Sequence, residues 1–187
     1  MINTALIGYG FAGKTFHAPL ISACPDLSLH TVVSTRPEAV HAEWPEARVV
    51  PDLATALADP EIDLVVIATP DALHADQAGA ALNAGKAVVV DKPFALSLAD
   101  ARRVVELAEQ KGLFLSVFQN RRWDADFLTL KAEIASGRLG DVVTVESRYD
   151  RHRPEVKDRW REAAGSGGVW LDLGPHLIGR ASCRERV

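Results

Sequence analysis

Through residues 1–120, short apolar runs alternate with segments in which apolar residues recur at helical spacing. In a parallel sheet with helices on both faces, the strands are buried on both sides and are therefore continuously apolar. The runs predicted as strands are 2–7, 29–34, 48–50, 63–68, 87–90 and 113–118. The segments predicted as helices are 14–23, 52–57, 71–85 and 97–112. This alternation predicts an α/β fold with a doubly wound parallel sheet in residues 1–120.

End signals support most of these helices, because Asp and Ser favour helix N-caps and glycine favours the position after the last turn. The predicted caps are Asp52, Asp71 and Ser97, and the predicted stops are Gly85 and Gly112. Pro19 lies inside the first helix and predicts a short or kinked element. Residues 36–47 contain two prolines, so they predict a connection with at most a short helix.

The pattern changes after residue 120. Residues 124–136 have the spacing of an amphipathic helix, and residues 141–149 alternate like a strand with one buried face. Residues 150–164 are dense in charge, and 165–168 predict a flexible glycine-rich loop. A second domain therefore begins near residue 121.

Composition and net charge indicate which classes of binding partner to expect. The 187 residues are 48% hydrophobic and 25% charged, as in a soluble globular protein, and the net charge of −4 gives no reason to expect nucleic acid or a membrane surface. No apolar run is long enough to span a membrane. A strand follows Met1 almost at once, so we expect no signal peptide. Cys24 and Cys183 form neither a disulfide framework nor a metal pattern, which favours a reducing, cytoplasmic setting.

The stretch after the first strand, Gly8-Tyr9-Gly10-Phe11-Ala12-Gly13-Lys14-Thr15, matches two phosphate-binding patterns. The first is the dinucleotide fingerprint G-x-G-x-x-G, and the second is the P-loop, G-x-x-x-x-G-K-T. Both place a glycine turn between a strand and a helix, with backbone N–H groups directed at a phosphate. The candidate cofactor-binding residues in this turn are Gly8, Gly10, Phe11, Ala12 and Gly13.

Three features favour the dinucleotide interpretation. Gly10 has no role in a P-loop but is required where the backbone approaches a pyrophosphate. Lys92 directly follows Asp91, and its charge would crowd a magnesium ion there. The second strand ends at Ser34, about 20 residues past the glycines, where a dinucleotide fold reads the ribose. A P-loop hydrolase and a glycine turn that binds nothing stay as alternatives.

The segment Ser34-Thr35-Arg36 bears on cofactor choice. An acidic residue here would bind the ribose hydroxyls of NAD and repel a 2′-phosphate. Two hydroxyls and a guanidinium suit that phosphate instead, although an arginine can also stack on adenine. The segment favours NADP over NAD.

Five motifs together resemble the glucose–fructose oxidoreductase / inositol dehydrogenase family (Gfo/Idh/MocA) over residues 1 to about 177. They are the glycine turn continuing through Lys14-Thr15-Phe16-His17-Ala18-Pro19-Leu20, Ala68-Thr69-Pro70 with His74, Asp91-Lys92-Pro93, Phe118 to Trp123, and Gly167 to His176. The resemblance implies an NAD(P)-dependent dehydrogenase of sugars, inositols or related polyols. It also implies a Rossmann domain in 1–120 and an open-sheet α/β domain, of which 121–177 is an incomplete first part. That second domain commonly forms a homo-oligomer interface.

The resemblance also implies roles for individual residues. Lys92, Asp172 and His176 correspond to the catalytic group, with Lys92 or His176 transferring the proton and Asp172 orienting substrate and lysine. Positions on the nicotinamide side of the cofactor correspond to Thr69, Pro70, His74, Asp91 and Gln119. Asp91 departs from the family's usual Glu. The substrate pocket is expected to include Lys92, Arg122, Trp123, Asp172 and His176, and Trp160 is a further candidate.

The residue chemistry supports part of this assignment independently. Lys92 follows an apolar strand, and ligands of open α/β sheets bind at the carboxyl ends of the strands. Asp172 and His176 are four residues apart, and a helix starting at Pro175, the position that proline prefers, would direct both towards one side. A non-catalytic dinucleotide-binding regulator on the same fold is the main alternative, and Lys92, Asp172 and His176 speak against it.

The last ten residues, 178–187, depart from the family pattern and show no amphipathic period. Gly179 stands where relatives commonly carry an acid. The codons ATC GGA AGA GCG TCG TGT AGG GAA AGA GTG, which read as a sequencing adapter, would encode this string. We therefore expect a non-native tail after Leu177 and a fragment that binds cofactor without appreciable turnover.

Overall fold

The computed structural model describes residues 1–150, 152, 154 and 168–184, with side chains described through residue 182. Two compact units make up the chain, Met1–Phe118 and Gln119–Val187. The charge-dense segment, Trp160 and the loop at 165–167 lie largely or wholly outside the described residues.

The first unit is built on a six-stranded sheet with the order β3-β2-β1-β4-β5-β6, in which every pairing is parallel. The strands are β1 (Ile2–Ile7), β2 (Leu27–Val33), β3 (Arg48–Val50), β4 (Leu64–Ile67), β5 (Ala87–Val90) and β6 (Leu115–Val117). The predicted doubly wound α/β sheet is confirmed. Its strand order turns at β1 and β4, and this is where ligands bind in such sheets.

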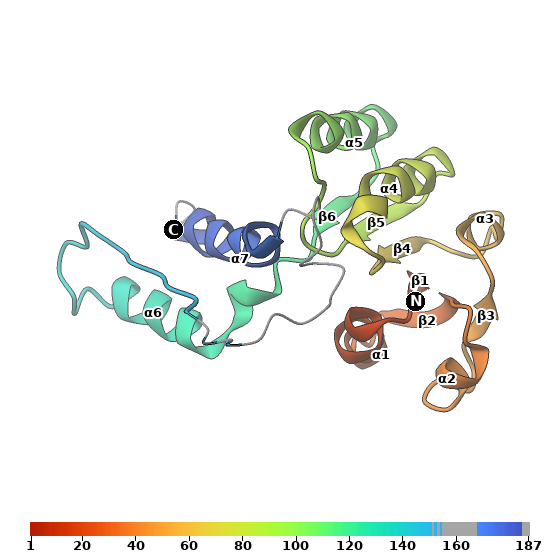
Figure 1. The fold of residues 1–187 in the computed structure, drawn as a ribbon, viewed down its shortest axis with the longest axis horizontal. Coiled ribbons are helices and arrows are strands. Elements are labelled where there is room, and N and C mark those ends of the chain that lie inside the picture. Colours follow the sequence, from red (N-terminus) through yellow and green to blue (C-terminus); the bar gives the residue numbers. More distant parts are fainter. Residues whose placement is uncertain (151, 153, 155–167, 185–187) are drawn as a thin grey trace. The chain divides into compact units, whose positions relative to one another are not determined.

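Helices cover both faces of this sheet, with α4 and α5 on one side and α1 and α2 on the other (Figure 1). The helical elements are η1 (Gly13–His17), α1 (Ala18–Ala23), α2 (Pro37–His41), α3 (Leu53–Leu57), η2 (Asp71–Leu73), α4 (His74–Asn83) and α5 (Leu98–Lys111). Successive strand residues point to opposite faces. Ala5 and Ile7 of β1 therefore pack in one core and Leu6 in the other.

Two of the three predicted caps form. The Asp52 carboxylate accepts from the Thr55 N–H at 2.8 Å, and Ser97 Oγ accepts from the Asp100 N–H at 3.0 Å. The prediction for Asp71 is wrong. Asp71 is buried in a short 3₁₀ turn, and α4 begins three residues later at His74.

Pro19 does not break the first helical segment. A π-helical turn, η1, directly precedes α1, and Pro19 is the second residue of α1. Proline has no N–H to donate and its ring clashes with the carbonyl four residues back, and a wider turn relieves both problems. His17, the last residue of the π turn, is buried as a result.

The second unit contains η3 (Asn120–Trp123), α6 (Ala125–Ala135) and α7 (Gly168–Arg184). The helix predicted over 124–136 is confirmed as α6. The strand predicted over 141–149 is wrong, because a strand needs a hydrogen-bonded neighbour and no described residue pairs with this segment.

Helix α7 corrects two further predictions. It begins at Gly168, well before Pro175, and it continues beyond Leu177 to Arg184. The Trp170 ring packs against Gly174 one turn later, since a Cβ on Gly174 would lie 3.0 Å from it. Beyond Leu177, ion pairs from Arg180 to Asp124 and Asp126 hold the helix. An amphipathic period in the sequence does not reveal such polar contacts.

Candidate functional site

The three glycines of the turn after β1 have different surroundings. Gly8 has a φ of +97°, and a Cβ there would lie 3.0 Å from the Ala68 carbonyl oxygen. A Cβ on Gly13 would lie only 2.1 Å from the Gly8 carbonyl oxygen. Gly10 has an ordinary φ, and a Cβ on it would meet no atom within 4 Å. Packing within the protein therefore requires glycine at 8 and 13, whereas Gly10 keeps open space beside the backbone.

The other two turn residues differ in exposure. Ala12 is half-buried, while the Phe11 ring is 72% exposed and meets the Phe16 ring edge to face, with centroids 5.7 Å apart. Both residues follow Gly10 at the start of the helical segment, where N–H groups have no partner within the helix. Their backbone is therefore placed to receive an anion.

Arg36 is anchored to the glycine turn. Its Nη2 donates to the Tyr9 carbonyl oxygen at 2.9 Å, and its backbone N–H donates to Ser34 Oγ at 3.0 Å. Thr35 and Arg36 are exposed, and Ser34 is half-buried. The structure thus brings the segment predicted to read the ribose against the turn predicted to bind the pyrophosphate.

Lys14, the residue that completes the P-loop pattern, is engaged elsewhere. Lys14 Nζ lies 2.5 Å from Glu43 Oε1, and Glu43 Oε2 accepts from the Tyr9 hydroxyl at 3.0 Å. Trp44 Nε1 donates to the same hydroxyl at 3.0 Å. The Lys14 and Tyr9 contacts hold the pKa of Glu43 below its usual range. Burial, reinforced by Glu43, raises the pKa of Tyr9. Sequence reasoning missed this network, because its members are far apart in the chain.

Asp91 and Lys92 directly follow β5, at the carboxyl edge of the sheet. Asp91 Oδ1 accepts from the Lys92 N–H at 2.8 Å, and Asp91 Oδ2 lies 3.6 Å from His17 Nε2. Burial by itself raises the pKa of Asp91, but the attraction of His17 and the N–H and charge of Lys92 outweigh it, so the pKa lies below its usual value. Asp91 is therefore an ionised carboxylate at neutral pH.

Thr69, Pro70 and His74 follow β4, the neighbour of β5. Thr69 Oγ1 donates to Gln77 Oε1 at 2.6 Å, and Pro70 is exposed. His74 is buried, with Nδ1 2.7 Å from the Pro93 carbonyl oxygen and Nε2 2.8 Å from the Thr69 carbonyl oxygen. Both ring nitrogens thus face backbone, so His74 itself presents no polar atom to a ligand.

The remaining predicted residues belong to the second unit. Asp172 and His176 lie one turn apart on α7 and therefore on one face of that helix. The His176 ring is buried, and its centroid lies 6.4 Å from the centroid of the Tyr149 ring. Arg122 Nε donates to the Gly179 carbonyl oxygen at 2.9 Å, and Trp123 is 77% exposed. Gln119 is half-buried at the start of this unit.

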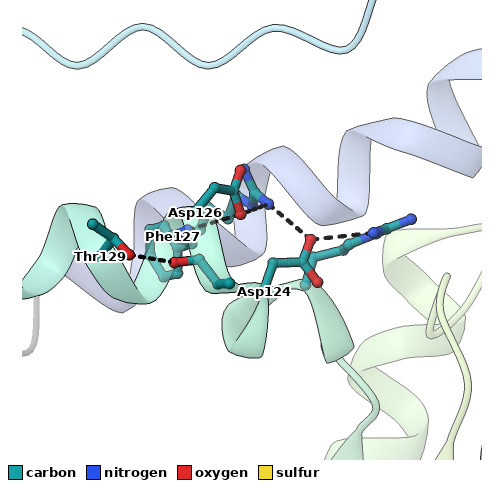
Figure 2. A network of polar contacts seen from close by, with 7 residues as sticks. Asp124, Asp126, Phe127 and Thr129 are labelled. Carbon is teal, nitrogen blue, oxygen red and sulfur yellow. Dashed lines mark hydrogen bonds and ion pairs between the residues drawn. The ribbon is translucent and has the colours of Figure 1, made fainter.

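Arg180 organises the best-defined polar network of the second unit. Figure 2 shows Asp124 and Asp126 at the start of α6, and both carboxylates bind the Arg180 guanidinium at 2.9–3.0 Å. Arg121 also donates to Asp124, at 3.1 Å. The guanidinium lies 5.6 Å from the centre of the Phe127 ring, within cation–π range. These contacts join α6 to α7.

Comparison with known proteins identifies the family. Residues 2–119 match the model of an oxidoreductase family with an NAD-binding Rossmann fold, and residues 127–182 match the GFO/IDH/MocA C-terminal domain. The chain belongs to the Gfo/Idh/MocA family. The resemblance drawn from the sequence motifs is thereby confirmed, and the Rossmann fold with it.

Individual relatives are similar along nearly the whole chain. The oxidoreductase YdgJ of Escherichia coli K12 is 53% identical over 96% of the chain, and the scyllo-inositol 2-dehydrogenase (NADP(+)) IolW of Bacillus subtilis 168 is 40% identical over 95%. The structure of the oxidoreductase YPO2259 from Yersinia pestis superposes with a TM-score of 0.92 at 53% identity, covering 98% of this chain and 52% of that one. The chain spans about half the length of these curated relatives, 52% of YdgJ and 50% of IolW.

Neither a membrane-spanning helix nor a metal-binding cluster occurs in the part of the chain that the structure describes. None of its helices is both long and apolar enough to cross a membrane. Its His, Cys, Asp and Glu side chains form no group of three or more that could hold a metal ion.

Proposed function

We propose that this Gfo/Idh/MocA chain binds a nicotinamide dinucleotide with its pyrophosphate on the Gly10 turn. The observation that carries the proposal is the contrast among the three glycines: protein atoms crowd Gly8 and Gly13 but leave Gly10 open. A backbone that binds pyrophosphate needs this open space, since any side chain would fill it. A glycine turn with a purely structural role gives no reason for glycine at position 10.

We further propose a preference for NADP(H) over NAD(H). Arg36 uses one N–H of its guanidinium on the Tyr9 carbonyl, which leaves further donors for a 2′-phosphate. Ser34 and Thr35 add hydroxyls, and no acid stands in the segment to repel that phosphate. The NADP(+) in the printed name of IolW, a 40% identical relative, is consistent with this choice.

For the whole protein we propose hydride transfer between the nicotinamide and a sugar, inositol or related polyol. The bound cofactor supplies the hydride donor or acceptor. Lys92 or His176 moves the proton of the reacting hydroxyl, and Asp172 orients substrate and lysine. Arg122 and Trp123 contribute to the substrate pocket. The names of IolW and of an inositol 2-dehydrogenase from Rhizobium meliloti, 35% identical, support this substrate class.

Cofactor binding can be tested on the 187-residue chain. We expect it to enhance NADPH fluorescence and to bind NADPH more tightly than NADH. Arg36→Glu should reverse the preference by repelling the 2′-phosphate, while Arg102→Glu makes the same charge change on exposed α5 and should leave it unaltered. Equal affinity for both cofactors in the wild-type chain would remove the NADP(H) preference. Binding of ATP and magnesium in place of either would revive the P-loop alternative.

We propose to test catalysis on the full-length protein. A polyol screen with both cofactors should reveal oxidation that Lys92→Ala abolishes, whereas the 187-residue chain should bind cofactor without turnover. Absence of oxidation of any polyol by the full-length protein would favour the non-catalytic regulator, whereas full activity of Lys92→Ala would remove Lys92 from the catalytic group. A cytoplasmic location and a homo-oligomeric state of the full-length protein also belong to this proposal, and size-exclusion chromatography with light scattering tests the latter.

A further inference from the structure

Two buried histidines contact the segment Asp91-Lys92-Pro93 from different elements. His17 comes from the π turn η1 and is 3% exposed, and His74 opens α4 and is 1% exposed. His17 faces the carboxylate of Asp91, and His74 faces the carbonyl of Pro93. The proposed acid/base residue Lys92 lies between these two contacted residues.

The His17 contact is longer than a hydrogen bond. Nε2 lies 3.6 Å from Asp91 Oδ2, and no described residue offers this buried nitrogen a hydrogen-bond partner. The ring also packs on Phe118, which follows β6, with centroids 4.5 Å apart. His17 therefore sits between the ends of β5 and β6, with a buried nitrogen directed at an ionised carboxylate.

The His74 contacts tie two loops together. The Thr69 carbonyl belongs to the loop after β4, and the Pro93 carbonyl belongs to the loop after β5. A neutral imidazole carries one N–H, so only one carbonyl receives a hydrogen bond unless the ring is protonated. In either state the ring fixes the spacing between two loops at the carboxyl edge of the sheet, where the nicotinamide would lie.

His17 and His74 both contact groups outside their own helical elements, in the segments that directly follow β4 and β5. Both contacts fall on the proposed nicotinamide side of the cofactor site, and neither falls on the Ser34-Thr35-Arg36 segment at the adenosine end. A π turn inserted in a helix frequently occurs at a functional site, and η1 is what places His17 here.

We propose that His17 and His74 are positioning residues: they hold Asp91-Lys92-Pro93 and Thr69 in place for the nicotinamide half of the cofactor without touching it. The inference rests on the proposed dinucleotide function. It changes the role of His74 from a cofactor-lining residue to one that acts through Thr69 and Pro93. It assigns a role to His17, whose place in the family motif carried none.

The test compares NADPH with 2′,5′-ADP, which contains the adenosine and the 2′-phosphate but lacks the nicotinamide. Dissociation constants are measured by titration calorimetry for the 187-residue chain and for His17→Phe and His74→Phe. We expect each variant to weaken NADPH binding about tenfold, the scale of one lost polar contact to a charged or buried group. Binding of 2′,5′-ADP should stay within about twofold, and the fluorescence enhancement of NADPH should fall because it reports the nicotinamide environment.

Matched controls come from the two remaining histidines of the first unit. His30→Phe removes a similar imidazole–carboxylate contact, since His30 Nε2 lies 3.7 Å from Glu61 Oε2. His41→Phe removes a similar imidazole–carbonyl contact, 3.2 Å from the Ala47 oxygen. Both controls should bind NADPH like the wild type. His74→Gln, whose amide can donate to either carbonyl, should restore part of the NADPH affinity.

The possible outcomes are separable. If the wild-type chain binds neither NADPH nor 2′,5′-ADP, the proposed function itself is wrong. If the wild type binds both, unchanged NADPH affinity in His17→Phe and His74→Phe would overturn the positioning role. An equal loss of both ligands would overturn it as well, since that result indicates general unfolding. Selective loss of NADPH with retained 2′,5′-ADP supports it.

Discussion

Replacing Gly10 by alanine should separate binding from stability. The new Cβ meets no protein atom within 4 Å, and the backbone φ is one that alanine adopts without strain. A strain-free Gly→Ala change stabilises a protein by about 0.4–1 kcal/mol, because it restricts the unfolded chain. The thermal midpoint should therefore stay the same or rise by up to about 4 °C.

Cofactor binding should respond in the opposite direction. The methyl group fills the space in which backbone N–H groups would reach the pyrophosphate at about 2.9 Å. A hydrogen bond to a charged group contributes about 1.5–3 kcal/mol, so losing one raises the dissociation constant of NADPH about tenfold to 150-fold. The assay is NADPH titration by fluorescence, beside thermal unfolding followed by circular dichroism.

Two other glycines give the controls. Gly85 has a φ of +79° and open space around it, so Gly85→Ala should cost about 1–2 kcal/mol of stability and leave NADPH binding unchanged. Gly13→Ala places a Cβ 2.1 Å from the Gly8 carbonyl oxygen and should damage both stability and binding. If Gly10→Ala binds NADPH like the wild type, the pyrophosphate does not lie against Gly10 and the reasoning fails.

Further predictions concern pH, helix capping and the C-terminal half of α7. Since the folded pKa of Asp91 lies below its unfolded value, the stability from its ionised form is present above about pH 4 and is lost as the pH falls through the folded pKa. Melting curves at several pH values should show this acid-side loss in the wild type and a flatter profile in Asp91→Asn; parallel profiles would contradict it. Ser97→Ala should cost about 1 kcal/mol in urea unfolding, because the Asp100 N–H loses its cap. Arg180→Ala should increase amide hydrogen exchange in α7 by removing the Asp124 and Asp126 contacts, and unchanged exchange would count against the network in Figure 2.

The first unit was largely predictable because its signals are local or strongly periodic. Continuous apolar runs mark strands buried on both faces, and each observed strand boundary lies within two residues of its predicted one. The Asp52 and Ser97 caps depend on residues three apart in the chain. The motifs at the glycine turn and at Asp91-Lys92-Pro93 indicate the family without coordinates, because each is a short stretch of contiguous residues.

The second unit was less predictable, since its elements depend on partners distant in sequence. The alternation over 141–149 suggested a strand, but alternation does not supply a neighbour to pair with. Helix α7 passes through Pro175 and past Leu177, contrary to both local expectations. Arg180 meets carboxylates more than fifty positions earlier in the chain, separations of 54 and 56 residues.

By itself, the sequence determined the fold class, the location of the glycine turn and the family, because hydrophobic period and short motifs encode all three. Tertiary structure alone decided what surrounds each site residue. It showed that Gly10 faces open space while Gly8 and Gly13 do not, that Glu43 engages Lys14, and that His74 faces backbone with both ring nitrogens. These facts depend on strand ends that are brought together only when the parallel sheet forms, and no local pattern in the chain records such distances.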